Sequence, residues 1–151
     1  QTPSGEAFPL SAYHGRPLLI ANTATECGFS NQLRDLQAVA ARFEPHGLAV
    51  IGAPSNDFAG QEPVADPDMI EVCGERFGVA FPLTAKIHVR GPNAHPLFQW
   101  VGEAFGAMAR PRWNFFKYVF DVEGRPVDWF SPLTAPDKHR LTTAIEKAIA
   151  V

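Results

Sequence analysis

The sequence predicts an α/β fold with a central mixed β-sheet and helices on both of its faces. Two observations support this prediction. Short apolar runs alternate with amphipathic runs through the first half of the chain, which is typical of parallel β-α-β units. Near the C-terminus, two strand-like runs flank the pair Glu123-Gly124, which predicts an antiparallel hairpin. At 151 residues the chain has the length of one domain, residues 1–151.

The predicted elements follow one another in a regular order. Strands are predicted over residues 17–22, 48–53, 84–89, 114–122 and 125–130. Helices are predicted over residues 30–45, 67–77, 95–105 and 135–150, so that strands and helices alternate up to the final pair of strands and the last helix. The first strand is a short apolar run between Gly15 and Thr23. The second strand, LAVIGA, is a similar run, and the Pro- and Gly-rich residues 54–66 that follow it are expected to form a loop.

Capping residues support the predicted helix boundaries. Ser30 is the expected N-cap of the first helix, whose apolar residues recur at three- and four-residue spacing. Asp66 is expected to cap the second helix, with Pro67 at its first position. Pro136-Asp137 is expected to begin the last helix. Together, the order and type of these elements predict a thioredoxin-like layout.

Composition and charge exclude several classes of function. The apolar fraction is 46% and the net charge is −3, so we expect neither disorder nor a basic surface for nucleic acid. No apolar run approaches the ~20 residues of a membrane span. The five histidines lack metal-ligand spacing, and neither a phosphate loop nor a dinucleotide fingerprint is present, so we predict no metal and no cofactor. The chain begins at Gln1 without methionine, which leaves the compartment open between the cytoplasm, slightly preferred, and an exported location such as the periplasm.

One of the two cysteines lies in the segment NTATECGFSNQL, between the first predicted strand and the first predicted helix. At such a junction, free backbone N–H groups and the helix dipole favour an anion, so Cys27 is expected to form a reactive thiolate. Cys27-Gly28-Phe29-Ser30 also has the form of a C-x-x-C redox turn whose second sulfur is replaced by a hydroxyl. The alternative is a buried cysteine that serves only as a small apolar side chain.

Four ordered blocks of the sequence resemble the glutathione peroxidase family, from about Pro9 to the C-terminus. The blocks are NTATECGFSNQLRDLQAV, GAPSNDFAGQEP, FPLTAKIHVRGPNAHPLFQWV and RWNFFKYVFDVEGRPVDWFSP. The chain looks like a non-selenium member, because a cysteine stands where the animal selenoenzymes of the family carry selenocysteine. The resemblance implies a thioredoxin-like fold and a peroxidase that reduces hydrogen peroxide and organic or lipid hydroperoxides.

The resemblance also implies which residues form the site. Cys27 would be the peroxidatic residue, whose thiolate attacks a peroxide oxygen and becomes a sulfenic acid. Gln61, Trp113 and Asn114 would supply neutral N–H donors, which stabilise an anion without a competing buried charge. The backbone amides of Cys27 and Gly28 would add further donors. Without these motifs, Gln61 would be interpreted as a solvated surface residue, Trp113 as a core residue and Asn114 as a turn residue.

Cys73, in MIEVCGERFGVAFP, occupies the place of the resolving cysteine of many non-animal family members. The resemblance implies an intramolecular disulfide with Cys27 that thioredoxin reduces, with glutathione as the alternative reductant; an inert helix cysteine is the other interpretation. Because a disulfide needs Cα atoms within roughly 7 Å, the helix over residues 67–77 is expected to unwind or swing during this step. Ser55 stands where many members carry a third cysteine, which leaves Cys73 as the only candidate.

The remaining expectations concern assembly and other functions. Only AMARPR separates Gly106 from Trp113, so the long loop that builds the interface of the tetrameric animal enzymes is missing and we expect a monomer. The same two cysteines would also suit a redox sensor that passes its disulfide to a partner protein. A thioredoxin-like oxidoreductase that acts on protein disulfides is disfavoured, because Ser30 cannot resolve a mixed disulfide.

Overall fold

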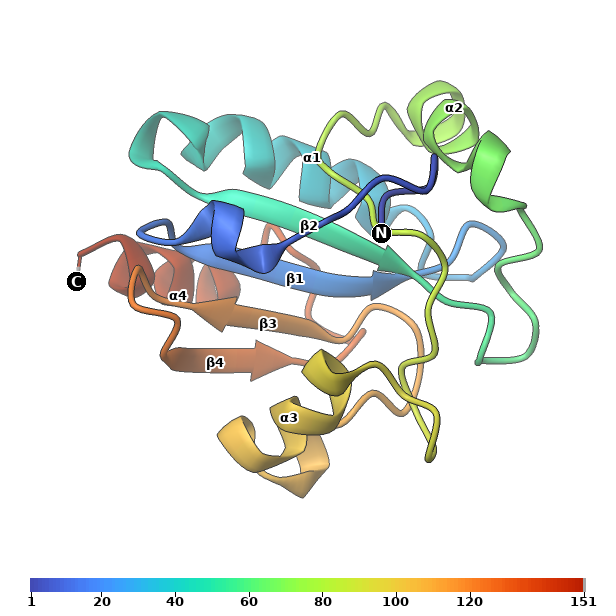
Figure 1. Ribbon diagram of the computed structural model, residues 1–151. Coiled ribbons are helices and arrows are strands. Elements are labelled where there is room, and N and C mark those ends of the chain that lie inside the picture. Colours follow the sequence, from blue (N-terminus) through green and yellow to red (C-terminus); the bar gives the residue numbers. More distant parts are fainter. Residues whose placement is uncertain (151) are drawn as a thin grey trace.

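Four strands form one mixed β-sheet at the centre of this computed structural model, which describes residues 1–150 (Figure 1). The strands are β1 (Leu18–Thr23), β2 (Ala49–Pro54), β3 (Lys117–Phe120) and β4 (Pro126–Phe130). Their order in the sheet is β2-β1-β3-β4. β1 and β2 are parallel, whereas β3 is antiparallel to both β1 and β4. The sheet confirms the predicted β-α-β unit and the predicted hairpin.

Helices cover both faces of the sheet (Figure 1). They are α1 (Gln32–Phe43), α2 (Asp66–Phe77), α3 (Pro96–Phe105) and α4 (His139–Ala150), with short 3₁₀ turns η1 (Leu10–Tyr13), η2 (Glu44–His46) and η3 (Ala107–Ala109). Because side chains alternate along a strand, Leu19 and Val119 join the buried cluster of α1, α2 and α4, whereas Ile20 and Tyr118 join the cluster of α3. Within residues 1–150, no helix combines the length and the apolar composition needed to cross a bilayer.

The prediction of a strand over residues 84–89 is wrong, because this segment forms no regular ladder. Its N–H groups have mixed partners: those of Thr84 and Ile87 donate to the β2 carbonyl oxygens of Gly52 and Pro54 at 2.9 and 3.0 Å, and two others bind carboxylates. Asp66 accepts the Lys86 N–H at 2.8 Å, and Asp57 accepts the Val89 N–H at 2.8 Å. Since a buried N–H group needs only an acceptor of any kind, an apolar pattern is not sufficient to make a strand.

Two predicted helix caps are also wrong. Ser30 does not cap α1, because the chain already winds through tight turns before the helix: the Ser30 N–H donates to the Cys27 carbonyl oxygen at 3.0 Å, and the Leu33 N–H donates to the Ser30 carbonyl oxygen at 2.9 Å. α1 therefore begins without a side-chain cap. Asp66 lies inside the first turn of α2 rather than before it, and its carboxylate binds the segment over residues 84–89.

Other element boundaries also differ from the prediction. α4 begins at His139 rather than at Pro136-Asp137, because the Lys138 N–H donates to the Ala135 carbonyl oxygen at 3.0 Å in a turn that precedes the helix. β3 is shorter than predicted at both ends, because residues 114–116 form an irregular turn and the strand ends at Phe120, before the turn of the hairpin.

Candidate active site

Cys27 lies in the loop between β1 and α1, at the end of the sheet where the parallel strands β1 and β2 both finish (Figure 1). Only 6% of the residue is exposed, and it belongs to the buried cluster of α1, α2 and α4. The backbone N–H of Phe29 donates to its Sγ atom at 3.4 Å. Gly28, predicted to support the sulfur, is exposed, so the amide that reaches Sγ is the one of the following residue.

Gln61 and Asn114 come from distant loops and meet as one amide pair. Asn114 is completely buried, and its Nδ2 group donates to Oε1 of Gln61 at 3.0 Å. The Oδ1 atom of Asn114 is buried and has no hydrogen-bond partner among the described residues. A buried carbonyl oxygen of this kind is an unsatisfied acceptor that solvent does not reach in this conformation.

Two hydrogen bonds join the Cys27 loop to the loop that carries Gln61. The Glu26 N–H donates to the Gln61 carbonyl oxygen at 2.9 Å. Next to this bond, the Thr25 hydroxyl donates to Oε2 of Glu62 at 2.5 Å. The two loops are therefore bonded residue by residue immediately before the cysteine.

Asn22, at the end of β1, holds the segment that carries Trp113 and Asn114. Asn22 is completely buried; its Nδ2 group donates to the Trp113 carbonyl oxygen at 2.9 Å, and its Oδ1 atom accepts the Phe116 N–H at 3.1 Å. The Phe115 N–H donates to the Asn22 carbonyl oxygen at 2.7 Å, and Phe115 turns the chain with a φ of 64°. Sequence reasoning missed this role, whose only signal is a polar residue at the end of an apolar strand.

The indole of Trp113 is half-buried, and its ring centroid lies 5.7 Å from that of Phe58, in the loop after β2. Trp113 packs against both buried clusters, including the one that contains Cys27. The structure therefore brings Cys27, Trp113 and the Gln61–Asn114 amide pair to the same end of the sheet.

Cys73 lies on α2 and is 1% exposed, in the same buried cluster as Cys27, and both thiols are free. Burial, and secondarily the negative charge of Glu62, raises the pKa of the Cys73 thiol to about 11, against an opposing effect of Arg76. A thiol with this pKa is almost entirely protonated at neutral pH. Since the thiolate is the nucleophile, Cys73 is unreactive in this conformation.

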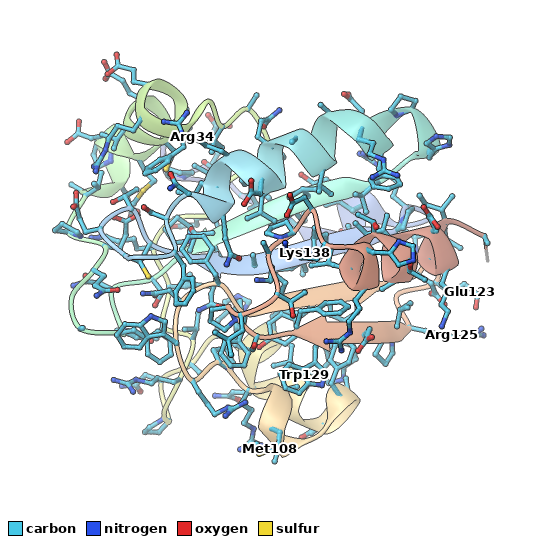
Figure 2. The ribbon with its side chains drawn as sticks, turned by 180° about the vertical axis from the view of Figure 1, so that it is seen from behind. Arg34, Met108, Glu123, Arg125, Trp129 and Lys138 are labelled. Carbon is cyan, nitrogen blue, oxygen red and sulfur yellow. The ribbon has the colours of Figure 1, made fainter. Side chains whose placement is uncertain are left out.

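Arginine contacts tie α2 to its neighbours. Arg34 of α1 donates to the Arg76 carbonyl oxygen at 2.5 Å, and Figure 2 shows Arg34 next to α2. The Arg76 guanidinium binds the carboxylate of Glu26 at 2.9 Å, and about half of each side chain is exposed. Exposed ion pairs contribute about 0.2–1 kcal/mol each, so this pair holds α2 only weakly.

A buried lysine links the start of α1 to the sheet. Lys117, the first residue of β3, is completely buried, and its Nζ donates to Oε1 of Gln32 at 2.6 Å. Gln32 donates in turn to the Pro132 carbonyl oxygen at 2.6 Å. Burial lowers the pKa of the Lys117 amine to about 7, and the charge of Asp35 opposes this shift. This chain of bonds fixes the helix that follows Cys27, and nothing in the sequence pattern indicated it.

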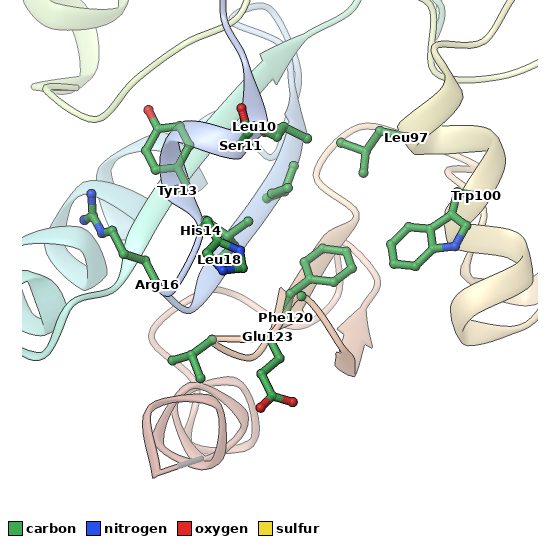
Figure 3. Close-up of a pocket in the computed structure, with 13 residues that line it drawn as sticks. Leu10, Ser11, Tyr13, His14, Arg16, Leu18, Leu97, Trp100, Phe120 and Glu123 are labelled. Atoms are coloured by element: carbon green, nitrogen blue, oxygen red, sulfur yellow. The ribbon is translucent and has the colours of Figure 1, made fainter.

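A concave pocket of about 220 Å³ lies at the opposite end of the sheet (Figure 3). The start of β1, the end of β3 and side chains of α3 line it, and Trp100 of α3 stacks on Phe120 with ring centroids 5.6 Å apart. None of the predicted site residues lines this pocket. Within residues 1–150, no group of three or more His, Cys, Asp or Glu side chains is arranged to hold a metal ion.

Comparison with known proteins agrees with the resemblance of the sequence motifs. The model of the family described as Glutathione peroxidase matches residues 1–102, which is more than half of the chain. The chain belongs to the glutathione peroxidase family. It is a family member of the non-selenium type, because residue 27 is a cysteine.

Two relatives and one solved structure illustrate this membership of the glutathione peroxidase family. Hydroperoxy fatty acid reductase gpx1 of Synechocystis sp. is 39% identical over 153 residues, which cover 96% of this chain and 89% of that protein. Glutathione peroxidase-like peroxiredoxin gpx1 of Schizosaccharomyces pombe is 33% identical over 135 residues, which cover 88% of this chain and 85% of that protein. The crystal structure of Trgpx in apo form superposes with a TM-score of 0.78 at 27% identity, covering 98% of this chain and 90% of that one.

These findings identify the activity and the fold. The protein is a glutathione peroxidase-like peroxidase, an enzyme that reduces hydroperoxides. Its fold is thioredoxin-like, as the order of predicted elements indicated.

Proposed function

We propose that this peroxidase is a two-cysteine enzyme that reduces hydrogen peroxide and organic or lipid hydroperoxides, and that thioredoxin recycles it. Cys27 is the peroxidatic residue and Cys73 the resolving residue. The observation that carries the proposal is the presence of two free, buried cysteines in one cluster, at the end of the sheet where the amide pair lies. The relative named hydroperoxy fatty acid reductase supports lipid hydroperoxides as substrates.

In the first step, the Cys27 thiolate attacks one oxygen of the hydroperoxide. The O–O bond breaks, the sulfur is oxidised to a sulfenic acid, and the other oxygen takes up a proton and leaves as an alcohol or as water. N–H groups of Gln61 and Trp113 stabilise the negative charge on the leaving oxygen.

In the second step, the Cys73 thiolate attacks the sulfur of the sulfenic acid. A disulfide forms, the S–O bond breaks, and hydroxide leaves as water after it takes up a proton. In the closed helix Cys73 is buried and has a pKa of about 11, so residues 67–77 unwind before this step. Gly74 inside α2 and Gly78 directly after it make the helix easier to open.

Thioredoxin is the proposed reductant, because an internal disulfide is reduced by exchange with the thiols of a dithiol protein. The S. pombe relative is named a glutathione peroxidase-like peroxiredoxin, which agrees with a thiol-based cycle. We also propose that the enzyme is a monomer, since only the short turn η3 lies between α3 and Trp113. A short connection leaves this end of the molecule accessible to a protein reductant.

The test is the intact mass of the reduced protein after one equivalent of hydrogen peroxide, for the wild type and for Cys73→Ser. We expect the wild type to lose two hydrogens and Cys73→Ser to gain one oxygen. Cys27→Ser is the control and should keep its mass. A wild type that stops at the sulfenic or sulfinic acid would exclude Cys73 as the resolving residue, and an unchanged wild-type mass would exclude Cys27 as the peroxidatic one.

A second measurement separates the two reductants. The oxidised protein is mixed with reduced thioredoxin or with glutathione, and recovery of the two thiols is followed by alkylation and mass. Thioredoxin should restore both thiols much faster than glutathione at equal thiol concentration. Faster recovery with glutathione would contradict the proposed donor and leave the roles of the two cysteines untouched.

A further inference from the structure

Glu62 is a buried carboxylate that takes no part in the steps above. Only 1% of the residue is exposed. Its Oε2 atom accepts the Thr25 hydroxyl at 2.5 Å, and its Oε1 atom has no hydrogen-bond partner among the described residues. Burial raises the pKa of Glu62, and the Thr25 hydrogen bond partly offsets this effect. Since a carboxylate is costly to bury, its presence at this place needs a physical reason.

The backbone of Glu62 is held by its own surroundings. Its N–H donates to Oδ1 of Asn56 at 2.9 Å, and its carbonyl oxygen accepts Nζ of Lys86 at 3.4 Å. The side chain of Glu62 therefore extends from a fixed backbone to the loop that carries Cys27.

The bond between Glu62 and Thr25 lies next to the 2.9 Å backbone bond between Glu26 and Gln61. Each loop contributes two adjacent residues, so the two bonds together set both the distance and the rotation between the loops. The backbone bond alone would let the loops rotate about it. Because Cys27 directly follows Glu26, and Gln61 directly precedes Glu62, such a rotation would move the sulfur relative to the amide donors.

We propose that Glu62 is a positioning residue for the peroxide reaction: through the Thr25 hydroxyl it fixes the loop of Cys27 relative to the loop that carries the amide donor Gln61. Its carboxylate does not touch the peroxide and takes up no proton during the reaction. The inference rests on the proposed function only in that Cys27 is the reacting residue. It needs neither Cys73 nor a particular reductant.

Four substitutions separate the effect of the hydrogen bond from that of packing. Thr25→Val keeps the shape of the side chain and removes the hydroxyl, whereas Thr25→Ser keeps the hydroxyl. Glu62→Leu removes the acceptor, whereas Glu62→Gln keeps an oxygen that the Thr25 hydroxyl can reach. All four are made in Cys73→Ser, so that oxidation stops at Cys27 and resolution plays no part.

The measured quantity is the rate constant for oxidation of Cys27 by hydrogen peroxide, from quenched samples read by intact mass. Thr25→Val and Glu62→Leu should each lose at least about tenfold, because small displacements of reacting groups have effects of this size. Thr25→Ser and Glu62→Gln should retain most of the rate. The double variant Thr25→Val/Glu62→Leu should be no slower than either single variant, because both remove the same bond.

Three outcomes would overturn the proposal: a parental rate for Thr25→Val, a Thr25→Ser variant as slow as Thr25→Val, or losses that multiply in the double variant. Near-UV circular dichroism and thermal unfolding report whether each variant is folded, and the Thr25 variants decide alone if Glu62→Leu is not. A Cys73→Ser parent that does not oxidise at Cys27 would instead refute the proposed function.

Discussion

The two cysteines of this peroxidase are both buried, but their surroundings differ. Cys27 is 6% exposed and lies in an irregular loop, where the N–H of Phe29 donates to its sulfur. Cys73 is 1% exposed and lies in a regular helix, where burial raises the pKa of its thiol to about 11. The difference teaches that backbone geometry, and not burial alone, determines what surrounds a buried thiol. A loop can direct a free N–H group at sulfur, whereas N–H groups inside a helix are already bonded to carbonyl oxygens of the preceding turn.

The same contrast extends to the segments that carry the cysteines. The loop of Cys27 is joined to its neighbour by a buried bond from the Thr25 hydroxyl and by a backbone bond from Glu26. α2, which carries Cys73, packs Met69, Cys73 and Phe77 into the cluster that it shares with α1, and its polar links to α1 and to the Cys27 loop are exposed contacts of Arg34 and Arg76. In the proposed cycle, only the resolution step by Cys73 therefore requires a rearrangement, the opening of α2.

The largest expected effect separates the roles of the two cysteines. With thioredoxin present, Cys27→Ser should consume no hydroperoxide above the uncatalysed rate, because the nucleophile is missing. Cys73→Ser should consume about one equivalent and then stop, because its sulfenic acid has no resolving thiol. A colorimetric assay of the remaining peroxide measures both. Continued turnover by Cys73→Ser would mean that the reductant reacts directly with Cys27. Cys73 would then not be needed as the resolving residue.

Alkylation of the reduced protein tests the environment of Cys73. Iodoacetamide should modify Cys73 at least about 100-fold more slowly in the folded protein than in urea, because its pKa is about 11 when folded and about 8.5 in a free thiol. Since the thiolate fraction rises tenfold per pH unit below the pKa, the folded rate should rise by about a hundredfold from pH 7 to pH 9. Peptide mass mapping gives the rates for both cysteines. A folded rate independent of pH would show that opening of α2, rather than ionisation, limits the reaction.

Removal of one amide side chain near Cys27 should slow the oxidation of Cys27 and leave the later disulfide formation unaffected. Asn114→Ala should slow the oxidation of Cys27 by about 10- to 100-fold, because the buried amide pair is lost. Disulfide formation after that step should be unchanged. Stopped-flow tryptophan fluorescence follows both phases. The matched control is Asn31→Ala, since Asn31 is exposed and makes no side-chain capping bond at α1. An equal decrease of the oxidation rate in Asn31→Ala, or an equal decrease of the rate of disulfide formation in Asn114→Ala, would contradict the conclusion that the amide pair acts only on the oxidation of Cys27.

The smallest expected effect concerns α2, the helix proposed to open during resolution. Arg34→Ala removes a contact between α1 and α2 and should speed disulfide formation by about two- to threefold, the size expected for an exposed contact. The matched control is Arg42→Ala, also on α1, whose ion pair with Glu146 at 3.9 Å does not involve α2. The second fluorescence phase gives the rate. Slower disulfide formation in Arg34→Ala would mean that the closed helix favours resolution, against the proposed unwinding.

Elements with strong local patterns could be predicted from the sequence. β1 is an apolar run because nearly the whole strand is buried, and α1 has three- and four-residue spacing because one face of the helix is buried. Both patterns can be recognised from residues that are close together in the chain. The hairpin of β3 and β4 follows from two strand-like runs around Glu123-Gly124. The cap predicted at Ser30 failed, because several local turns can satisfy the same N–H groups.

Segments whose hydrogen-bond partners lie far along the chain could not be predicted. Residues 84–89 are apolar enough for a strand, yet Asp66 and Asp57 bind the N–H groups of Lys86 and Val89, which interrupts the backbone bonds to β2, and no ladder forms. Nothing in the sequence around Asn22 indicates that it binds the backbone on both sides of Asn114.

By itself, the sequence determined the chemistry that is available: the cysteine after β1, the amide and indole donors in their motifs, and the second cysteine on a helix. Only the tertiary structure decided how these groups meet. It pairs Gln61 with Asn114, bonds Thr25 to Glu62, and leaves Cys73 buried with a raised pKa. The physical reason is that local patterns record which side of each element is buried, whereas the partner of a buried polar group is set by the packing of the whole sheet and its loops.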